Sequence, residues 1–499
     1  MNVKTKIKLN YEEFRDKVYA CWVGKNIGGT MGAPYEGTKE KLDIKGYATE
    51  ANVVLPNDDL DLQLIWLHAI ETEGPSKINA QSLGEFWLSY IVPHWNEYGI
   101  GKNNMERGLI PPLAGDYENT WKDSNGAWIR TEVWACTAPG CPDIAAKYAI
   151  EDAKVDHGAG EGTYAAAFVA ALQSAAFFIS DLRECIKIGL SMIPEDSRMA
   201  DSVRFILECY DNKIPAMEAR DLIQQRNADI GTGWFEAPSN VAYAIIGLLY
   251  GEGDFKKTML TAINCGDDTD CTAATVGATL GILGGSKIIP ADWQKHIGDD
   301  IVTLSINRGS VGRGIPATCT ELTERVCKQA PHMLLANRAY VAIVDGATEI
   351  DDEGLSAIRN ADCSHTLDNF KIMDHIKNLK PYTMDFDSTI AYVKVVLDRA
   401  PDIAPGEEIG VSVSVTNKIF STDAKPYNID FRWWLPEGFS VKGRKSAPLQ
   451  RRDRHYDGRT TLSFTLSAGE EVEAENRVVL EVNFKGRCTP VYVPIILLG

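Results

Sequence analysis

Two short acidic stretches hold the side chains best suited to chemistry. The first, "NDDLD", contains Asn57, Asp58 and Asp59, and the second, "GDDTDC", contains Asp268 and Asp270. Each stands directly before an apolar periodic segment, where a single Asp or Asn caps a helix for roughly 1 kcal/mol. Further carboxylates repel one another by about 1 kcal/mol per pair at 4 Å in water, and by more near a low-dielectric surface. Capping explains one residue in each stretch, and a bound cation would explain the others.

If the two stretches meet in space, they form an oxygen-rich ligand set. Their carboxylates, the amide oxygen of Asn57 and the hydroxyl of Thr269 are hard ligands. Such ligands are typical of Mg²⁺ and Mn²⁺, whereas zinc sites use His or several thiolates. The sequence therefore favours one or two Mg²⁺ ions, with Mn²⁺ as an alternative. Helix capping stays open as the explanation of either stretch taken alone.

The segments around these stretches predict one large helical domain over residues 1–330. Apolar residues recur at i, i+3, i+4 and i+7 from about residue 11 to about residue 326, with short Gly or Pro breaks. After "GDDTDC", the Ala, Gly and Thr residues of 273–283 predict a helix that approaches its neighbours closely. The clearest helical segments are "YEEFRDKVYACWVG", "LDLQLIWLHAIETEG", "DIAAKYAIEDAKV", "TYAAAFVAALQSAAFFIS" and "NVAYAIIGLLYGEG".

Residues 391–499 follow a different pattern, that of an antiparallel, immunoglobulin-like β-sandwich. Short β-branched and aromatic runs alternate with Pro, Gly, Asn and Asp turns. We treat 331–390 as a transition segment, because its pattern favours neither class. The predicted strands are "AYVKVVLD", "EIGVSVSVTN", "NIDFRWWLP", "TTLSFTL", "RVVLEVNF" and "VYVPIILLG".

Charge and composition exclude several classes of partner. The 499 residues carry a formal charge of −18, from 51 Lys and Arg against 69 Asp and Glu, which disfavours nucleic acid and anionic membrane surfaces. The weakly polar run 165–179 is shorter than the roughly 20 residues of a membrane span. No secretion signal is visible, and the eleven cysteines lack metal-type spacing. We expect a cytoplasmic protein with reduced, buried thiols. An exported chain from which a signal was removed is the alternative for the location, and a Cys136–Cys141 disulfide is the alternative for the thiols.

Several motifs in one order resemble the ADP-ribosylglycohydrolases, the DraG-like superfamily. "CWVGKNIGGTMGAPYEG" is similar to the N-terminal Gly-rich motif of that family, "NDDLD" to its Thr-Asp-Asp motif and "GDDTDC" to its Gly-Asp-Thr-Asp-Thr motif. "NGAWIRTEVWACTAPG", "DHGAGEGTYAAAFVAA" and "GTGWFEAPSNVAYAIIGLLY" resemble further family segments. The resemblance covers about residues 11–325 and not the predicted sandwich.

This resemblance implies an all-α domain that holds two divalent cations, usually Mg²⁺, between helix ends. The cations would bind ribose hydroxyls and activate water beside the anomeric carbon. Glu36 corresponds to the mobile gating glutamate of the family, and Asp58 or Glu36 would accept the proton of that water. The implied catalytic residues are Glu36, Asp58 and Asp268, and the implied metal ligands are Asn57, Asp58, Asp59, Asp268, Asp270 and Cys271.

Three departures from the family pattern bear on metal and substrate. Asn57 replaces the Thr before the first Asp pair, and its amide oxygen can still bind a hard cation. Cys271 replaces the final Thr and is a softer ligand. Gly28 and Gly29 stand where the family carries an acidic residue. These changes leave open another metal, a single ion, or a substrate other than ADP-ribose.

Two Gly-rich turns are candidates for substrate binding. His157, Gly158 and Glu161 in "DHGAGEGTY" correspond to a family loop that borders the nucleotide site, and a turn or capping role is the alternative. The backbone N–H groups of Gly231, Thr232 and Gly233 in "GTGWFE" can approach a phosphate. The adjacent Trp234 suits either a core position or a stacking platform.

Three arginines and a tryptophan pair are secondary candidates. Arg130 in "AWIRTE", with Arg308 and Arg313 in "RGSVGRG", would supply positive charge for a pyrophosphate. In "FRWWLP", Trp433 and Trp434 must point to opposite faces of a strand. One is therefore expected in the core, and an exposed one would suit contact with carbohydrate.

The leading hypothesis is a metal-dependent hydrolase that cleaves an ADP-ribosyl N- or O-glycosidic bond through metal-activated water. Its partner would be a small-molecule or protein-linked ribosyl substrate. One alternative is a glycoside hydrolase for a non-nucleotide furanosyl substrate. The other is a catalytically inactive binding or structural protein of the same fold.

Overall fold

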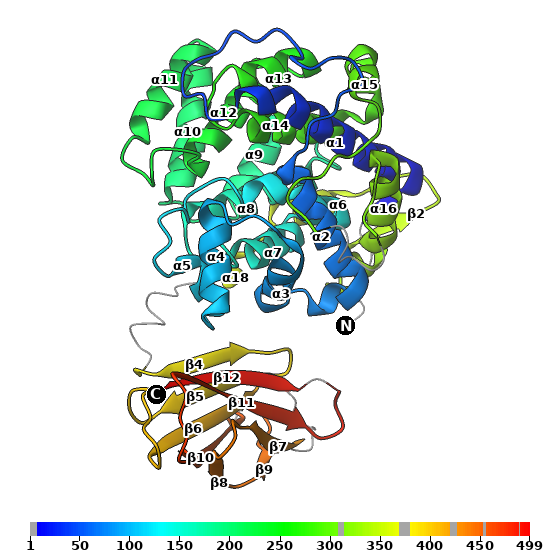
Figure 1. Cartoon of the computed structure of the whole chain (residues 1–499). Helices are drawn as coiled ribbons and strands as arrows, with labels where there is room; N and C mark the ends of the chain where they lie inside the picture. The colour runs from blue at the N-terminus through cyan, green and yellow to red at the C-terminus, as the bar shows by residue number, and fades with distance from the viewer. Residues whose placement is uncertain (1–6, 308–313, 369–379, 420–426, 453–455, 489) are drawn as a thin grey trace. The chain divides into compact units, whose positions relative to one another are not determined.

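The computed structural model divides the chain into two units, residues 1–372 and 373–499 (Figure 1). It describes residues 7–307, 314–368, 380–419, 427–452, 456–488 and 490–499. The helical unit and the strand-rich unit each have a hydrophobic core of their own. Arg308 and Arg313 lie outside the described residues.

The first unit is built from helices, as the apolar periodicity predicts. The five segments singled out in the sequence correspond to α1, α2, α7, α8 and α12. The helices are α1 (Tyr11–Gly32), α2 (Asp58–Glu73), α3 (Ala80–Tyr90), α4 (Asn96–Glu106), α5 (Leu113–Asp116), α6 (Glu132–Thr137), α7 (Pro142–Ala153), α8 (Glu161–Ala175), α9 (Leu182–Leu190), α10 (Arg198–Asp211), α11 (Ala216–Arg226), α12 (Ala237–Tyr250), α13 (Phe255–Ile263), α14 (Thr269–Gly284), α15 (Ala291–Ile297), α16 (Cys319–Ala336), α17 (Asp352–Arg359) and α18 (Ser364–Asp368).

Helices α1 and α14 pack along a seam of small residues (Figure 1). Ala20, Gly24, Gly28 and Gly32 recur every four residues and so form one stripe on α1. An added Cβ on Gly24 would lie 2.6 Å from the carbonyl carbon of Gly277, and one on Gly32 would collide with the backbone of Asp270. The helices therefore run antiparallel in backbone contact. The seam fixes the start of α14 against the end of α1.

Parts of the segment 331–390 belong to each unit. Strand β1 (Ile7–Asn10) pairs in parallel with β2 (Val341–Val344) and antiparallel with β3 (Glu349–Ile350), which adds a small sheet to the helical unit. Helix α17 also lies in this unit. Strand β4 (Thr383–Asp387) pairs with the next strand and lies in the second unit.

The second unit is an antiparallel sandwich of two sheets. Their strand orders are β4-β5-β6-β10-β8 and β12-β11-β7-β9. Alternate residues of β6, such as Val411, Val413 and Val415, point into the shared core. In the pairing of β6 with β10, Val413 lies opposite Leu462. The remaining strands are β5 (Ala391–Leu397), β6 (Glu408–Asn417), β7 (Tyr427–Trp434), β8 (Ser440–Gly443), β9 (Ser446–Leu449), β10 (Arg459–Ser467), β11 (Glu475–Phe484) and β12 (Val491–Leu498).

The tryptophan pair alternates across β7 as predicted. Trp433 packs against Phe464 with ring centroids 5.2 Å apart, whereas Trp434 is 47% exposed. The Arg432 guanidinium lies 4.0 Å from the Trp434 ring, and the indole N–H donates to Glu481. Contact of Trp434 with carbohydrate stays a prediction, and it would require Arg432 to move.

Two further expectations concern the thiols and membrane spans. All eleven cysteines are free, and every one except Cys488 is buried. Cys136 and Cys141 therefore form no disulfide with each other. Among the described helices, none combines the length and apolarity needed to cross a bilayer.

Candidate metal centre

The two acidic stretches converge at the adjacent starts of α2 and α14. Ligand atoms of Asp59, Asp270 and Cys271 lie within 4.8 Å of one another, and so do those of Glu36, Asp268 and Asp270. Asp270 is common to both groups. The Asp59 group, which we call the inner half, is fully buried, whereas the Glu36 group, the outer half, includes an exposed carboxylate. These halves would hold two neighbouring cations or a single one.

Capping does not account for the two stretches. Asn57 and Asp268 occupy the N-cap positions of α2 and α14, yet neither side chain caps its helix. Elsewhere in the same chain, Asn79, Asp181 and Asp254 cap their helices in the ordinary way. The side chains of Asn57 and Asp268 are thus not used as helix caps.

Several buried polar atoms of this cluster have no hydrogen-bond partner among the described residues. Buried polar atoms are nearly always satisfied, so a group of orphaned oxygens in one place indicates a missing ligand. A hard divalent cation fits this donor set. The atoms are both side-chain polar atoms of Asn57, Oδ2 of Asp59, Oδ1 of Asp268 and Oδ1 of Asp270.

Electrostatics supports the same fit. Repulsion from Asp270, with burial and Asp58, raises the pKa of Glu36 to about 8. Burial, with Asp270 and Asp61, raises the pKa of Asp58 to about 7. The pKa values of Asp59 and Asp268 are also far above the usual range, chiefly because of burial. A bound divalent cation would offset this repulsion among the carboxylates.

Cys271 sits in the inner half as a thiol. Its Sγ donates to Oδ1 of Asp59 over 3.2 Å. Burial and the nearby carboxylates raise the pKa of Cys271 well above its ordinary value, so the proton stays on sulfur. A protonated thiol is a weak ligand for Mg²⁺. The inner half is therefore the poorer cation site.

Asn125 orients one of the candidate ligands. Its Nδ2 donates to Oδ2 of Asp268 over 2.6 Å, and its Oδ1 accepts from the indole N–H of Trp128 over 2.8 Å. Asn125 stands in "NGAW", within a segment that resembles the family, but nothing in that segment indicates a role for its side chain. Only the fold, which brings residues 125 and 268 together, reveals this contact.

Three loops form the mouth of the cluster. Asp267 exchanges backbone hydrogen bonds with the 36–38 loop, and its carboxylate accepts from Asn240 and from the backbone N–H of Phe235. Across this junction, the Lys39 ammonium lies 4.2 Å from the ring centroid of Trp234, which is 43% exposed. An exposed aromatic ring and a cation thus flank the approach to Glu36.

His157, Gly158 and Glu161 make structural contacts. The imidazole of His157 is completely buried, with Nδ1 2.9 Å from Oδ1 of Asp156. The Glu161 carboxylate accepts from the backbone N–H groups of Arg198 and Met199, at the start of α10. Gly158 is buried and has a φ of +50°. Their assignment to substrate stays a prediction.

The 231–233 turn already holds an anion. The N–H groups of Thr232 and Gly233 donate to Oε1 of Glu236 over 2.6 and 2.8 Å. A side chain on Gly231 would collide with the same carboxylate. These N–H groups would bind a phosphate only if Glu236 moved aside.

Arg130 is not available to a substrate, contrary to the sequence-based expectation. Its guanidinium has no exposed surface and pairs with Asp152 and Asp156 over 3.0 and 2.8 Å. Arg130 also lies over the ring of Trp87. The arginine is part of the interior of the helical unit, because two buried carboxylates require a buried cation.

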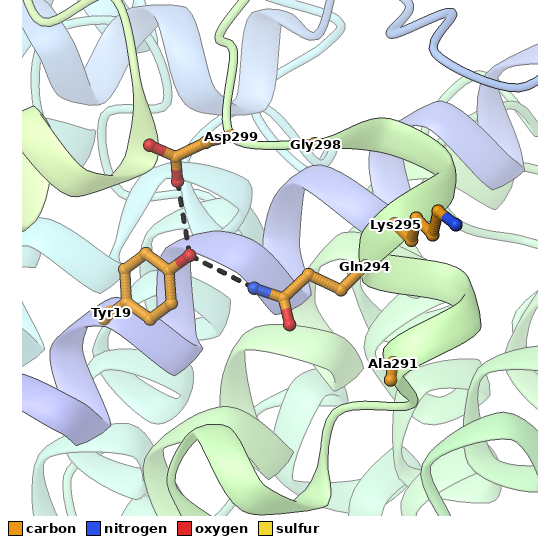
Figure 2. A pocket seen from close by; sticks show the side chains of 6 residues that line it. All are labelled: Tyr19, Ala291, Gln294, Lys295, Gly298 and Asp299. Carbon is orange, nitrogen blue, oxygen red and sulfur yellow. Dashed lines mark hydrogen bonds between the residues drawn. The ribbon is translucent and has the colours of Figure 1, made fainter.

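A separate hollow of about 340 Å³ lies between Tyr19 of α1 and residues 291–299, which include α15 (Figure 2). The Tyr19 hydroxyl accepts from Nε2 of Gln294 over 3.1 Å and donates to Oδ1 of Asp299 over 3.3 Å. Ala291, Lys295 and Gly298 complete the lining, and no residue of the acidic cluster takes part. The hollow is therefore not part of the candidate metal centre.

Comparison with known proteins identifies one family over most of the chain. Residues 10–332 match the family model described as ADP-ribosylglycohydrolase. A comparison with curated proteins finds no match.

Several solved structures are similar to parts of this chain. One titled "ADP-ribosylglycohydrolase-related protein complex" is 20% identical, covers 65% of this chain and 99% of its own, and has a TM-score of 0.40. A FixG-related protein from Vibrio parahaemolyticus is 15% identical, covering 22% of this chain and 94% of its own with a TM-score of 0.18. The GAE domain of GGA2p from Saccharomyces cerevisiae is 14% identical, with coverages of 24% and 97% and a TM-score of 0.15.

Proposed function

The chain belongs to the ADP-ribosylglycohydrolase family, and from this premise we propose that it is a metal-dependent hydrolase of a ribosyl N- or O-glycosidic bond. ADP-ribosyl adducts, free or attached to protein, are the first substrates to test. The observation that carries the proposal is the group of orphaned oxygens on Asn57, Asp59, Asp268 and Asp270. Residues of two distant stretches leave these atoms unpaired in one buried place.

The residues that would hold the cation are Asn57, Asp58, Asp59, Asp268 and Asp270, with Glu36 at the open side. Mg²⁺ is the ion that these oxygens fit best, and Mn²⁺ is the alternative. When bound, such a cation orders sugar hydroxyls and lowers the pKa of water. Cys271 is the weakest of the candidate ligands, for the reasons given above.

The chain's own groups would handle the proton and the leaving group. Glu36 is exposed at the mouth, and its carboxylate can accept a proton from an attacking water once a cation relieves the repulsion from Asp270. Asp58 is half-buried and is the second candidate base. Asn125 holds Asp268 in place through the 2.6 Å hydrogen bond. Trp234 and Lys39, which contact each other at the edge of the 36–38 loop, are proposed to contact the leaving group or a phosphate.

A non-nucleotide furanoside is the second candidate substrate. Arg130 is buried and paired, and the 231–233 turn is occupied by Glu236. Among the described residues at the mouth, Lys39 is the cation best placed to meet a pyrophosphate. This scarcity of positive charge favours an uncharged sugar derivative over ADP-ribose.

A hydrolysis panel would distinguish these substrates. ADP-ribosylated arginine and serine peptides and O-acetyl-ADP-ribose would be compared with simple furanosides and pyranosides, with Mg²⁺ and with Mn²⁺. Turnover of ADP-ribosyl compounds alone would exclude the glycoside, and turnover of simple glycosides alone would exclude the ADP-ribosyl assignment. If no compound of the panel is hydrolysed, the hypothesis of a catalytically inactive binding protein is favoured.

Matched variants would link turnover to the cluster. Asp268→Asn removes a proposed ligand, whereas Asp267→Asn changes the neighbouring carboxylate, which is bonded to Asn240 instead. We expect Asp268→Asn to abolish Mg²⁺ binding in calorimetry and turnover with it. Asp267→Asn should retain metal binding. Equal metal binding in the Asp268→Asn protein would refute the shared centre.

A further inference from the structure

Arg220 is a buried arginine of α11 that reaches two segments of the candidate metal centre. Its Nε donates to the carbonyl of Cys265 over 2.7 Å, and its Nη2 donates to the carbonyl of Lys39. Cys265 lies three residues before Asp268 in the chain. Lys39 lies three residues after Glu36. One side chain therefore bridges the two segments that supply the outer half.

The segment that carries Glu36 lies antiparallel to the start of the second acidic stretch. We call residues 36–44 the Glu36 loop. The Gly37 N–H donates to the carbonyl of Asp267 over 2.8 Å, and the Asp267 N–H donates to the carbonyl of Thr38 over 2.6 Å. This pairing begins at the residue after Glu36, so it sets where the Glu36 carboxylate lies.

Asn264 holds the far end of the Glu36 loop. Its Oδ1 accepts from the N–H of Ile44 over 2.6 Å, and its Nδ2 donates to the carbonyl of Ile44 over 3.2 Å. The carbonyl of Asn264 accepts from the N–H of Leu42 over 3.0 Å. The loop is therefore bonded at both ends to the segment that precedes the second acidic stretch, and Arg220 holds its middle at Lys39.

The shape of the guanidinium suits this position. It is planar and donates in several fixed directions, so one arginine can serve two carbonyls that belong to different segments. Nη1 of Arg220 donates to Oε1 of Gln224 over 2.6 Å and to Oδ1 of Asp221 over 3.3 Å, which fixes the direction of the group. The guanidinium also lies 5.5 Å from the ring centroid of Tyr243. Its effect on the two carbonyls is directional, because both are neutral acceptors.

We propose that Arg220 is a positioning residue of the metal centre. By joining the two carbonyls, its guanidinium holds the Glu36 loop in place and keeps the Glu36 carboxylate beside Asp268 and Asp270, also in the metal-free protein. The proposal rests on the metal binding proposed above. It departs from the family resemblance, which implies that this glutamate is a mobile gate. In this chain Glu36 is a fixed member of the outer half.

Hydrogen exchange of the full chain in EDTA tests this clamp without metal. We expect the amides of the Glu36 loop to exchange about tenfold faster in Arg220→Met than in the unmodified protein, because local opening becomes easier. Arg226→Met is the matched control, since Arg226 lies in the same helix and pairs with Asp201 instead. Unchanged exchange of the loop in Arg220→Met would overturn the proposal. An equal rise across all helices would mean general destabilisation and would overturn it too.

Arg220→Lys provides a second variant that keeps a buried donor. A lysine can reach one of the two carbonyls but lacks the fork that serves both. We expect the exchange of the Glu36 loop to rise about threefold in this variant, between the unmodified protein and Arg220→Met. If Arg220→Met does not fold, Arg220→Lys carries the comparison, and an unchanged loop in it would overturn the proposal.

A double-mutant cycle links the clamp to the metal. Mg²⁺ affinity would be measured by calorimetry for the unmodified protein, Arg220→Met, Glu36→Gln and the double variant. If Arg220 acts through Glu36, its loss should weaken binding about tenfold in the unmodified background and less than about twofold in Glu36→Gln. Equal losses in both backgrounds would make Arg220 a general support of the fold and overturn the proposal. If the unmodified protein binds no Mg²⁺, the proposed function is refuted, and hydrogen exchange alone decides whether Arg220 holds the loop.

Discussion

Gly29 and Asn57 compete for one space: a Cβ on Gly29 would lie 2.6 Å from Cγ of Asn57 and would collide with its amide nitrogen. The two positions are departures from the family pattern, which has an acidic residue near the first and a Thr at the second. The structure relates them, because the larger Asn occupies volume that only a glycine leaves free. We interpret them as one compensated change at the metal centre.

We therefore predict that Gly29→Asp alone destabilises the protein. Overpacking of this kind costs about 1–3 kcal/mol, and a displaced Asn57 would also weaken metal binding. Adding Asn57→Thr should restore much of the melting temperature and of the Mg²⁺ affinity. Thermal unfolding with and without Mg²⁺ measures both. Gly46→Asp is the control, since nothing lies within 4 Å of a Cβ there. A double variant no better than Gly29→Asp would refute the compensation.

Cys271→Thr should shift metal preference toward Mg²⁺. The substitution replaces a protonated thiol with a hydroxyl oxygen, which is the harder ligand. We expect about a tenfold gain in Mg²⁺ affinity relative to Mn²⁺, or about 1.4 kcal/mol. Competitive calorimetric titrations would measure it. Cys265→Thr is the matched control. Cys265 is also buried and lies six residues earlier in the sequence, but its thiol donates to the carbonyl of Thr261. An unchanged preference would make Cys271 a packing residue.

Asn125→Ala should weaken metal binding through Asp268. Residues that orient metal ligands typically contribute 10- to 100-fold in affinity, and we expect a loss in that range. Isothermal titration with Mg²⁺ measures it. Asn104→Ala offers a comparison, because Asn104 is also buried and donates to the carbonyls of Ala114 and Tyr117. That variant should lose stability but keep its metal affinity, and equal metal losses in both would argue against a positioning role.

The metal-free protein should become less stable as pH rises from about 4 to about 8. Burial raises the pKa of Asp58 from 3.8 to about 7, and repulsion from Asp270 raises that of Glu36 from 4.5 to about 8. In this window the folded chain binds more protons than the unfolded chain, so the free energy of unfolding falls with rising pH.

Melting curves in EDTA at pH 5 and pH 8 would check this, with roughly 1–2 °C of melting temperature lost for each kcal/mol in a unit of this size. Saturating Mg²⁺ should flatten the dependence, because the cation replaces the protons. Asp58→Asn should reduce the slope in EDTA, which isolates this group from other titrating residues. A melting temperature that rises with pH in EDTA would contradict the raised pKa values.

Sequence patterns predicted the elements that carry their own periodicity. The run of residues 163–180 predicted α8, found at Glu161–Ala175, and the alternation in "EIGVSVSVTN" predicted β6. Strands β1 and β2 were missed, because each has four residues and its partner lies at the other end of the helical unit. Strands this short carry no local signal of their pairing.

The sequence named the candidate metal ligands, but it did not indicate which charged residues around them are buried and paired. Each of the two stretches holds more acidic residues than a helix cap needs, and this excess indicated a cation. The side chains that would bind it were named from the sequence. Lys25 in "VGKNIGG" gave no sign of burial, because its partner Glu132 comes from another helix. Arg130 was misjudged for the same reason. Long-range pairing determines whether a charged residue is buried, and a local pattern does not report it.

The glycine seam also sets an order of events during synthesis. The stripe on α1 and its partner stripe on α14 are roughly 240 residues apart in the chain. At roughly 5–20 residues per second, the first helix leaves the ribosome about 10–50 s before its partner. The backbone of α14 that this stripe contacts in the folded unit has not been synthesised during that interval. The nascent chain thus carries this glycine-lined helix without its partner for about half of its translation.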